Sequence, residues 1–353
     1  MPDTPTSENA DRDGGSQSVV PRLSVVIPVH NSSETLAGSV RGAVEASGPN
    51  DEIIIADDGS TDGCVAALDP FLLDSVKVVT SPVNIGRGPI RNLGAECATG
   101  DVLVFIDSDV IIDRAALERF RVAFTDPDCT AVIGSYDDHP GEPGVVSQYR
   151  NLLHHHTHKT HGDKATHFWT GIGAVRRSVF EELGGLDTTR WARDMEDVEF
   201  GHRLVDSGRT IEVVPEITGT HHKRFTVRSM IRVDLRNRAI PWTHLMMSDG
   251  FRIDSFVVSP VQVLSGLFVA VMLLALVVTP FVLKAAWVAL GSLVAFVAVN
   301  ASLWHTLASA RGLAFALLCV PLHLLQTTVS GLGFVIALGQ RAGQVILPRR
   351  TRG

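Results

Sequence analysis

Cysteine is scarce in this sequence, and a basic surface is not expected from its composition. The 353 residues include four cysteines, Cys64, Cys97, Cys129 and Cys319, and none of them forms a C-x-x-C pair. Isolated cysteines exclude a dense disulfide framework and are typical of a reducing compartment. The net charge of −7 at pH 7 excludes the broad positive footprint of nucleic-acid-binding proteins, so no nucleic acid is expected as a partner.

Two common nucleotide-binding fingerprints and a signal peptide are also missing. The segment GRGPIR, residues 86–91, lacks the G-x-G-x-x-G spacing, and no P-loop is present. Residues 1–22 are polar, rich in Gly and Ser and without periodicity, so we expect a disordered N-terminal tail. Because this tail lacks the apolar stretch of a signal peptide, we expect the domain that follows it to be cytoplasmic.

Short apolar runs in the first half predict the strands of a parallel sheet. Each run ends in polar residues, and the segments between the runs have the apolar spacing of helices. The runs are residues 23–29, 52–56, 76–79 and 102–106. This alternation predicts a doubly wound α/β sheet with a Rossmann-like, nucleotide-sized crevice at the carboxyl ends of the strands.

The last of these strands leads directly into Asp107, Ser108 and Asp109. Two carboxylates in such a place repel each other unless a cation or a proton joins them. A hard divalent ion that also binds a substrate diphosphate removes this repulsion, although a lone D-x-D is also common in turns. Arg87 and Arg91 suit an anionic diphosphate, but solvated loop residues have the same composition.

Four motifs in a fixed order carry a family resemblance. VVIPVHN, IIIADDGSTDG, NIGRGPIRNLG and FIDSD resemble the nucleotide-sugar-binding half of family 2 glycosyltransferases with the GT-A fold. The resemblance covers about residues 23–238 and implies a GT-A catalytic domain, which we place at residues 23–224. It also implies a nucleotide-diphosphate-sugar donor and a divalent metal, Mg²⁺ or Mn²⁺.

The same resemblance implies which residues bind the nucleoside. Pro28 and His30 would line the nucleoside pocket. Asp58 would hydrogen-bond the base, a role that Asp57 is placed to share, and Arg91 would lie near the base and the diphosphate.

The resemblance also implies which residues bind the metal and the sugar, and these residues come later in the chain. Asp107 would lie near the ribose and the metal, and Asp109 would ligate the metal. GT-A enzymes commonly bring a late histidine to the metal or the diphosphate, and of the two candidates, His221 and His222, we choose His222. Gly171 would keep the backbone close to the donor sugar.

Glu196 and Asp197 form a second chemical centre, in the segment WARDMEDVEFGHRL. Inverting sugar transfer needs a base that takes the acceptor hydroxyl proton as the oxygen attacks the anomeric carbon. The ED pair of the resembled family matches these two residues and implies that Asp197 is the base. Carboxylates in a first helical turn have a second interpretation as complements of the helix dipole.

A histidine-rich segment, residues 145–161, contains LLHHHTHKTH. Histidine-rich tracts are often metal sites, but the spacing here is too crowded for one defined site. We expect a partly ordered surface helix or a helix on the acceptor side.

The last part of the chain predicts membrane helices. No Asp or Glu follows Asp254, and three stretches contain no charged residue and exceed the length that crosses a bilayer. They are residues 256–283, 285–310 and 312–340. We expect about three transmembrane helices in residues 256–340, an amphipathic interfacial segment at 225–255 and a basic tail at 341–353. Three crossings conflict with the positive-inside tendency, which leaves the third stretch as a possible re-entrant segment.

These observations lead to one functional expectation and two alternatives. We expect a multi-pass enzyme of the cell membrane that transfers a sugar, with inversion, to a lipid-linked acceptor such as a polyprenyl phosphate or to a glycan. Membrane lipids would be further partners. A processive polysaccharide synthase is one alternative, although its Q-x-x-R-W motif is missing. A non-catalytic membrane scaffold is the other, although the D-x-D and ED pairs are both intact.

Overall fold

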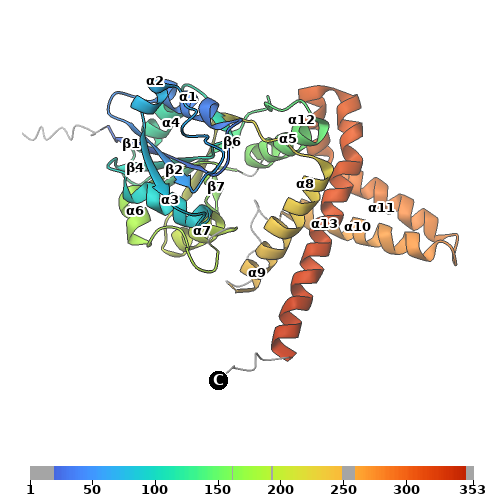
Figure 1. The fold of residues 1–353 in the computed structure, drawn as a ribbon. Helices are drawn as coiled ribbons and strands as arrows, with labels where there is room; N and C mark the ends of the chain where they lie inside the picture. The colour runs from blue at the N-terminus through green and yellow to red at the C-terminus, as the bar shows by residue number, and fades with distance from the viewer. Residues whose placement is uncertain (1–19, 161, 192–193, 249–258, 347–353) are drawn as a thin grey trace, which may run out of the picture.

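The computed structural model describes residues 20–160, 162–191, 194–248 and 259–346. An α/β domain and a group of long helices make up these residues, and the helices lie to one side of the domain (Figure 1). Most of the expected N-terminal tail, the end of the interfacial segment and most of the basic tail lie outside the described residues.

A mixed sheet of nine strands forms the core of the α/β domain, in the order β3-β2-β1-β4-β8-β6-β9-β5, with β7 paired to β9. The bounds are β1 Leu23–Val29, β2 Glu52–Asp58, β3 Lys77–Ser81, β4 Val102–Ile106, β5 Val110–Ile112, β6 Ala131–Tyr136, β7 Lys164–Ala165, β8 Ile172–Arg176 and β9 Ile211–His221. The four strands expected from the sequence are β1 to β4, and they pair in parallel. The predicted α/β fold is therefore confirmed.

The predicted nucleotide-binding residues lie at the edge of the sheet where the strand order reverses. Strand β1 pairs with β2 on one side and β4 on the other, so the chain moves outward from β1 in both directions. Ligands of such sheets bind outside the carboxyl ends of the strands at this switch point. Pro28, near the end of β1, and His30 and Asp107, just after β1 and β4, lie at this edge.

Helices cover both faces of the sheet, which explains why the central strand β4 is apolar and buried throughout. Val102, Val104 and Ile106 of β4 pack on the face covered by α1, α2 and α4. Leu103 and Phe105 pack on the opposite face, with α3, α6 and α7. The bounds are α1 Leu36–Ala46, α2 Pro70–Asp74, α3 Arg87–Glu96, α4 Ala116–Ala123, α6 Arg177–Glu182 and α7 Glu196–Asp206.

The remaining helices form the second part of the molecule. They are α5 Val145–Thr160, α8 Val227–Arg232, the π-helix η1 Val233–Ala239, α9 Ile240–Ser248, α10 Pro260–Val278, α11 Ala285–Val299, α12 Ala301–Arg311 and α13 Leu313–Ile346. Helices α5 and α8 lie between the sheet and α12 and α13, and α10 and α11 project away from the α/β domain (Figure 1). The histidine-rich segment is therefore a helix at the junction of the two parts.

Two described helices, α10 and α13, are long and apolar enough to cross a membrane. Helices α11 and α12 meet that test only as a pair, and they are bent by 63°. The break falls at Asn300, whose side-chain amide donates to Phe296 O and to Ser265 Oγ of α10. The predicted third stretch is one continuous helix through Pro321, so the irregular stretch is the second and not the third.

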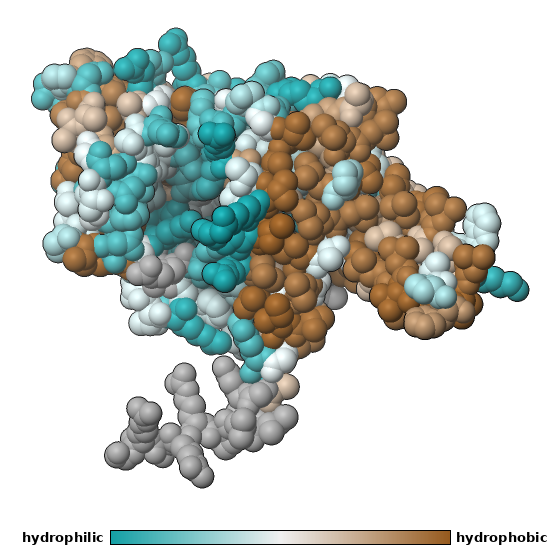
Figure 2. All heavy atoms as spheres, turned by 45° about the vertical axis from the view of Figure 1, so that its right-hand side comes forward, coloured by the Kyte–Doolittle hydropathy of each residue, from teal (hydrophilic) through white to brown (hydrophobic). Residues whose placement is uncertain are grey.

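Apolar side chains are exposed on these helices and in the turn that joins α10 to α11. Phe281 is 87% exposed, Leu283 is 80% exposed and Trp287 is 75% exposed. Figure 2 shows a broad hydrophobic surface over this part, next to a hydrophilic hollow in the α/β domain. An exposed apolar surface of this extent indicates association with a membrane.

The expected interfacial segment is described over residues 225–248, and it is helical from residue 227 to residue 248. It is not free on a surface, because Ala239 lies against Gly333 of α13, where an added Cβ atom would meet the Ala239 Cβ atom. At its other end, Leu245 packs with Met195 and Val198, next to the ED pair. This segment therefore connects α13 to α7.

Candidate active site

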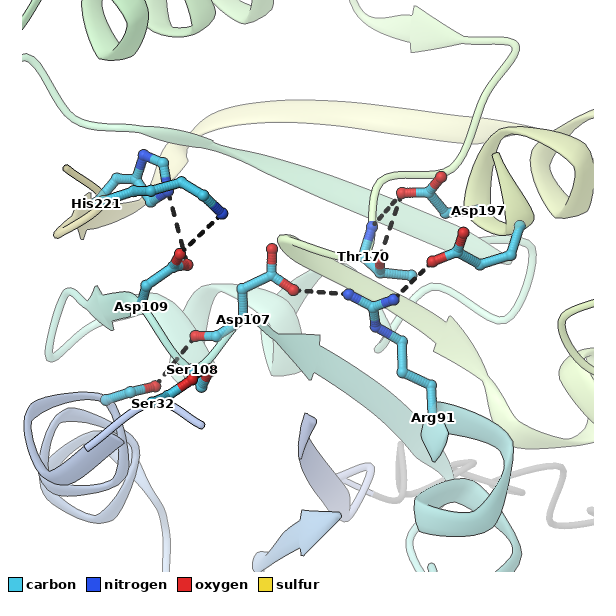
Figure 3. Close-up of polar contacts among 11 residues, drawn as sticks. Ser32, Arg91, Asp107, Ser108, Asp109, Thr170, Asp197 and His221 are labelled. Atoms are coloured by element: carbon cyan, nitrogen blue, oxygen red, sulfur yellow. Dashed lines mark hydrogen bonds and ion pairs between the residues drawn. The ribbon is translucent and has the colours of Figure 1, made fainter. Parts of the chain in front are cut away.

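Arg91 lies at the centre of the site and joins its two carboxylate groups (Figure 3). Its Nη2 atom donates to Asp107 Oδ1 at 2.7 Å, and its Nη1 atom donates to Glu196 Oε1 at 2.8 Å. The side chains of Arg91 and Glu196 are only 5% and 4% exposed. The D-x-D motif after β4 and the ED pair of α7 are thus parts of one buried network.

Glu196 is a perturbed acid within this network. Burial and the charge of Asp197 raise the pKa of Glu196 to about 7, although Arg91 opposes the shift. For Arg91, the charges of Asp107 and Glu196 outweigh the cost of burial and raise the pKa of the guanidinium. The guanidinium therefore stays charged while its partner Glu196 titrates near neutral pH.

Asp197 points away from Arg91 and toward Thr170, just before the start of β8 (Figure 3). Its Oδ2 atom accepts a hydrogen bond from Thr170 Oγ1 at 3.3 Å, and its Oδ1 atom accepts one from Val198 N at 2.9 Å. The preceding residue, Met195, has a φ of 75°, which is uncommon for a side chain of this size. Backbone of this kind is found at functional sites, and here it starts the helix that carries both carboxylates.

Asp109 lies beside a lysine and a histidine at the C-terminal end of β9. Lys223 Nζ lies 3.2 Å from Asp109 Oδ2, and His221 Nε2 lies 3.6 Å from Asp109 Oδ1. Burial alone would raise the pKa of Asp109, but Lys223 and His221 together hold it well below its usual range. Asp109 is therefore ionised at any physiological pH.

The histidine next to Asp109 is His221 and not His222. The His221 ring is stacked on Tyr136, with 4.2 Å between the ring centroids, which fixes its position in the site. The ring of His222 lies against Gly141 instead, and only its backbone N–H reaches Asp109, at the carbonyl oxygen. Neighbouring residues of a strand point to opposite faces, so the two imidazoles cannot both face the D-x-D motif.

The donor atoms near the D-x-D motif suit a divalent ion. Asp109 Oδ1 is buried and has no hydrogen-bond partner, which is expected for a carboxylate oxygen that ligates a cation when one is bound. Asp107 is one-third exposed and supplies a second carboxylate. Within the described ranges, no group of three or more His, Cys, Asp or Glu side chains forms a complete metal site. A hard cation here would complete its oxygen ligands from a bound diphosphate or water.

At the nucleoside end, Asp58 organises the loop before α3. Its two carboxylate oxygens accept hydrogen bonds from Ile85 N at 2.6 Å and Gly86 N at 3.1 Å. His30 Nδ1 lies 2.8 Å from the Asp58 carbonyl oxygen, and Asp57 Oδ1 accepts from Ser60 N at 3.0 Å. These contacts fix the start of the helix that carries Arg91.

A glycine is needed at position 171 because the Trp169 ring leaves no room for a side chain there. A Cβ atom at this position would lie 2.5 Å from the Trp169 ring, and the Gly171 carbonyl accepts a hydrogen bond from Asp107 N at 3.2 Å. The resemblance implies that the block containing Trp169 and Thr170 borders the sugar, but the sequence gives neither residue a role of its own. Trp169 also contacts Tyr136, at 4.8 Å between ring centroids.

These observations define a class of protein. A mixed α/β sheet with a D-x-D motif at its switch point and a second carboxylate pair joined to it by Arg91 is the arrangement of a GT-A nucleotide-sugar-binding domain. The sequence model of Glycosyl transferase family 2 matches residues 24–184. The α/β domain is therefore similar to family 2 glycosyltransferases over residues 24–184.

Relatives and a solved structure agree with this assignment. Glycosyltransferase GlyG of Streptococcus pneumoniae is 30% identical over 124 residues, which are 35% of this chain and 41% of GlyG. The pre-mycofactocin glycosyltransferase of Mycobacterium tuberculosis is 28% identical over 223 residues, which are 59% of this chain and 44% of that protein. The chain thus spans less than half of either relative.

A mannosyltransferase from Pyrobaculum calidifontis, PcManGT, was solved in complex with GDP-Man and Mn²⁺. It has a TM-score of 0.55 to this chain at 18% identity, with 90% of this chain and 87% of that chain covered. At this identity the similarity shows the fold, and it extends beyond the α/β domain into the helices.

Proposed function

We propose that the protein is a membrane-bound inverting glycosyltransferase that transfers a sugar from a nucleotide-diphosphate-sugar to a lipid-linked or glycan acceptor. The observation that carries this proposal is the buried bridge from Asp107 through Arg91 to Glu196. It joins the donor side of the crevice to the residue next to the base. A scaffold protein has no use for such a costly buried ion network between two motifs.

The donor would bind along the carboxyl ends of β1, β2 and β4. Pro28, His30 and the Asp57–Asp58 pair would hold the nucleoside, and Gly171 would border the sugar. The complex of PcManGT with GDP-Man and Mn²⁺ supports a nucleotide sugar and a divalent ion as ligands.

Asp107 and Asp109 would hold the divalent ion, Mg²⁺ or Mn²⁺, with His221 beside them. When bound, the ion would offset the negative charge of the diphosphate. Lys223, which contacts Asp109, would contribute to the same charge balance as the diphosphate leaves.

Asp197 would act as the general base. The acceptor oxygen would attack the anomeric carbon as the bond from that carbon to the diphosphate oxygen breaks, and the acceptor proton would pass to a carboxylate oxygen of Asp197. Thr170 and the Val198 N–H would keep this carboxylate oriented, and Glu196 would anchor the start of α7 to Arg91.

The helices would place this chemistry at the cell membrane. We propose a multi-pass protein with α10 and α13 as spans and with the α/β domain in the cytoplasm. The hydrophilic hollow that borders the hydrophobic surface in Figure 2 supports an acceptor that reaches the site from the membrane.

The test uses the full chain, purified in detergent and supplied with a lipid extract. Radiolabelled nucleotide sugars are supplied one at a time with Mn²⁺ or Mg²⁺, and then with a chelator. Metal-dependent label in the organic phase supports the proposal and names the sugar. A long water-soluble product favours the polysaccharide synthase, and no label together with no nucleotide binding favours the scaffold.

A further inference from the structure

A second buried arginine lies where the catalytic domain meets the membrane helices. Arg150, on α5, has a side chain that is 1% exposed and pairs through Nη1 with Asp234 of η1, at 2.9 Å from Oδ1. Its Nε and Nη2 atoms are buried and have no hydrogen-bond partner. The guanidinium also lies over the Phe225 ring, 5.6 Å from its centroid. Two strong donors are therefore left for a ligand.

A third arginine shares this space. Arg238, one turn beyond Asp234 on η1, lies with Nη2 2.9 Å from His154 Nε2. Burial, followed by the charge of Arg150, lowers the pKa of Arg238 to about 10. Burial, followed by the charges of Arg238 and Arg150, also holds the pKa of His154 well below its usual range. His154 is therefore a neutral partner that adds no negative charge.

The immediate group thus has more positive than negative charge. Arg150 and Arg238 carry two positive charges, and Asp234, with a side chain that is 3% exposed, is a carboxylate paired with Arg150. Two like charges in a poorly solvated place are costly unless an anion is bound between them. Arginine is well suited to this task because its planar fork matches the oxygens of a phosphate.

The group lies near the proposed base, Asp197. The charges of Asp197 and Tyr136 both act on the pKa of Arg238, so its guanidinium lies within electrostatic range of the proposed base. On the other side, η1 packs against α13 at Gly333, so the group also borders the membrane helices. The π-helical form of η1 fits this location, because such turns are frequent at functional sites.

We propose that Arg150 and Arg238, with His154 behind them, bind a phosphate group on a membrane-borne acceptor. This inference rests on the proposed glycosyltransferase function and specifies the acceptor as a phosphate-bearing lipid. The phosphate would sit between the two guanidinium groups, and the lipid chain would extend along α13.

The test is equilibrium binding by the full chain in a neutral maltoside detergent. The probes are decyl phosphate, the uncharged decyl glucoside and inorganic phosphate. Arg238→Gln removes one donor group, Arg238→Lys keeps its charge, and Arg236→Gln is the matched control, since Arg236 is exposed on the same helix. Nucleotide binding by each variant shows that the protein is folded.

We expect decyl phosphate, but not decyl glucoside, to bind the wild type and Arg236→Gln equally. Binding by Arg238→Gln should be about tenfold to a hundredfold weaker, the range for loss of a charged hydrogen bond, and Arg238→Lys should recover part of it. In transfer assays, Arg238→Gln should raise the KM for the acceptor and leave the KM for the donor unchanged.

Each source of phosphate gives a distinct result. Inorganic phosphate that binds at least tenfold more weakly than decyl phosphate supports a lipid acceptor, and equal affinities overturn the lipid part of the inference. Equal binding of decyl phosphate by the wild type and Arg238→Gln overturns the site itself. Failure of the wild type to bind or use any nucleotide sugar would instead overturn the proposed function.

Discussion

Arg91 and Glu196 are 105 residues apart in the sequence and form a buried ion pair, with 2.8 Å between Nη1 and Oε1. The pair joins α3, which opens at the donor loop, to the first turn of α7, which carries Asp197. The position of the proposed base therefore depends on a residue of the donor side. If the proposed function holds, Arg91 would link binding of the donor to alignment of the base.

Replacement of Arg91 by Gln should abolish transfer and destabilise the protein. The change leaves Asp107 and Glu196 without their shared cation, and breaking a buried pair in this way costs about 3–5 kcal/mol. Arg114→Gln is the control, because Arg114 is 82% exposed and its pair with Glu45 lies on the surface. Melting temperature and transfer rate are measured for both variants, and equal melting temperatures would contradict the structural role of Arg91.

Replacement of Asp197 by Asn should reduce kcat by about 10²–10⁴-fold, the usual contribution of a general base. Donor affinity should be unchanged, because Asp197 faces Thr170 and not Arg91. Thr170→Val should give a smaller loss, since it removes only the hydroxyl that orients the carboxylate at 3.3 Å. Full activity of Asp197→Asn would show that the acceptor needs no base at this position.

Stability should depend on pH through Glu196. Its pKa rises from 4.5 to about 7 on folding, so the folded protein binds this proton more tightly than the unfolded chain. The stabilisation is complete below pH 4.5 and is lost as the pH rises through 7. The melting temperature of the wild type should fall relative to that of Glu196→Gln between pH 5 and pH 8. Parallel curves for the two proteins would contradict the raised pKa.

The two adjacent histidines should differ in their effect on metal dependence. His221→Ala removes the imidazole beside Asp109 and should raise the Mn²⁺ concentration needed for half-maximal donor binding. His222→Ala is the matched control and should leave that concentration unchanged, because its ring faces Gly141. Titration of donor binding with Mn²⁺ gives this concentration for each variant. A larger increase for His222→Ala than for His221→Ala would show that His222 is the residue near the metal.

Local patterns predicted strands β1 to β4, because strand signals are contained in five to seven neighbouring residues, but they did not predict the antiparallel half of the sheet. The run Val102–Ile106 is buried throughout, as its composition indicates, and the D-x-D motif follows it at the edge of the crevice. The order of the motifs along the chain was sufficient to predict the GT-A fold.

Contacts between distant segments were not predictable in this way. No local pattern pairs Arg91 with Glu196 or brings Arg150 to Asp234, because each pair joins helices whose packing depends on the whole fold. The choice between His221 and His222 depended on the end of β9, and strand boundaries are poorly defined by composition. The 63° bend at Asn300 likewise depends on a hydrogen bond to another helix.

The central claim is inverting, metal-dependent transfer at this site, and the configuration of the product tests it most directly. The enzyme is supplied with its donor, acceptor and Mn²⁺, and the anomeric configuration of the new bond is determined by NMR. One base and a single displacement predict a product of inverted configuration that forms only with the metal. Retained configuration, or equal product in the presence of a chelator, would contradict the account.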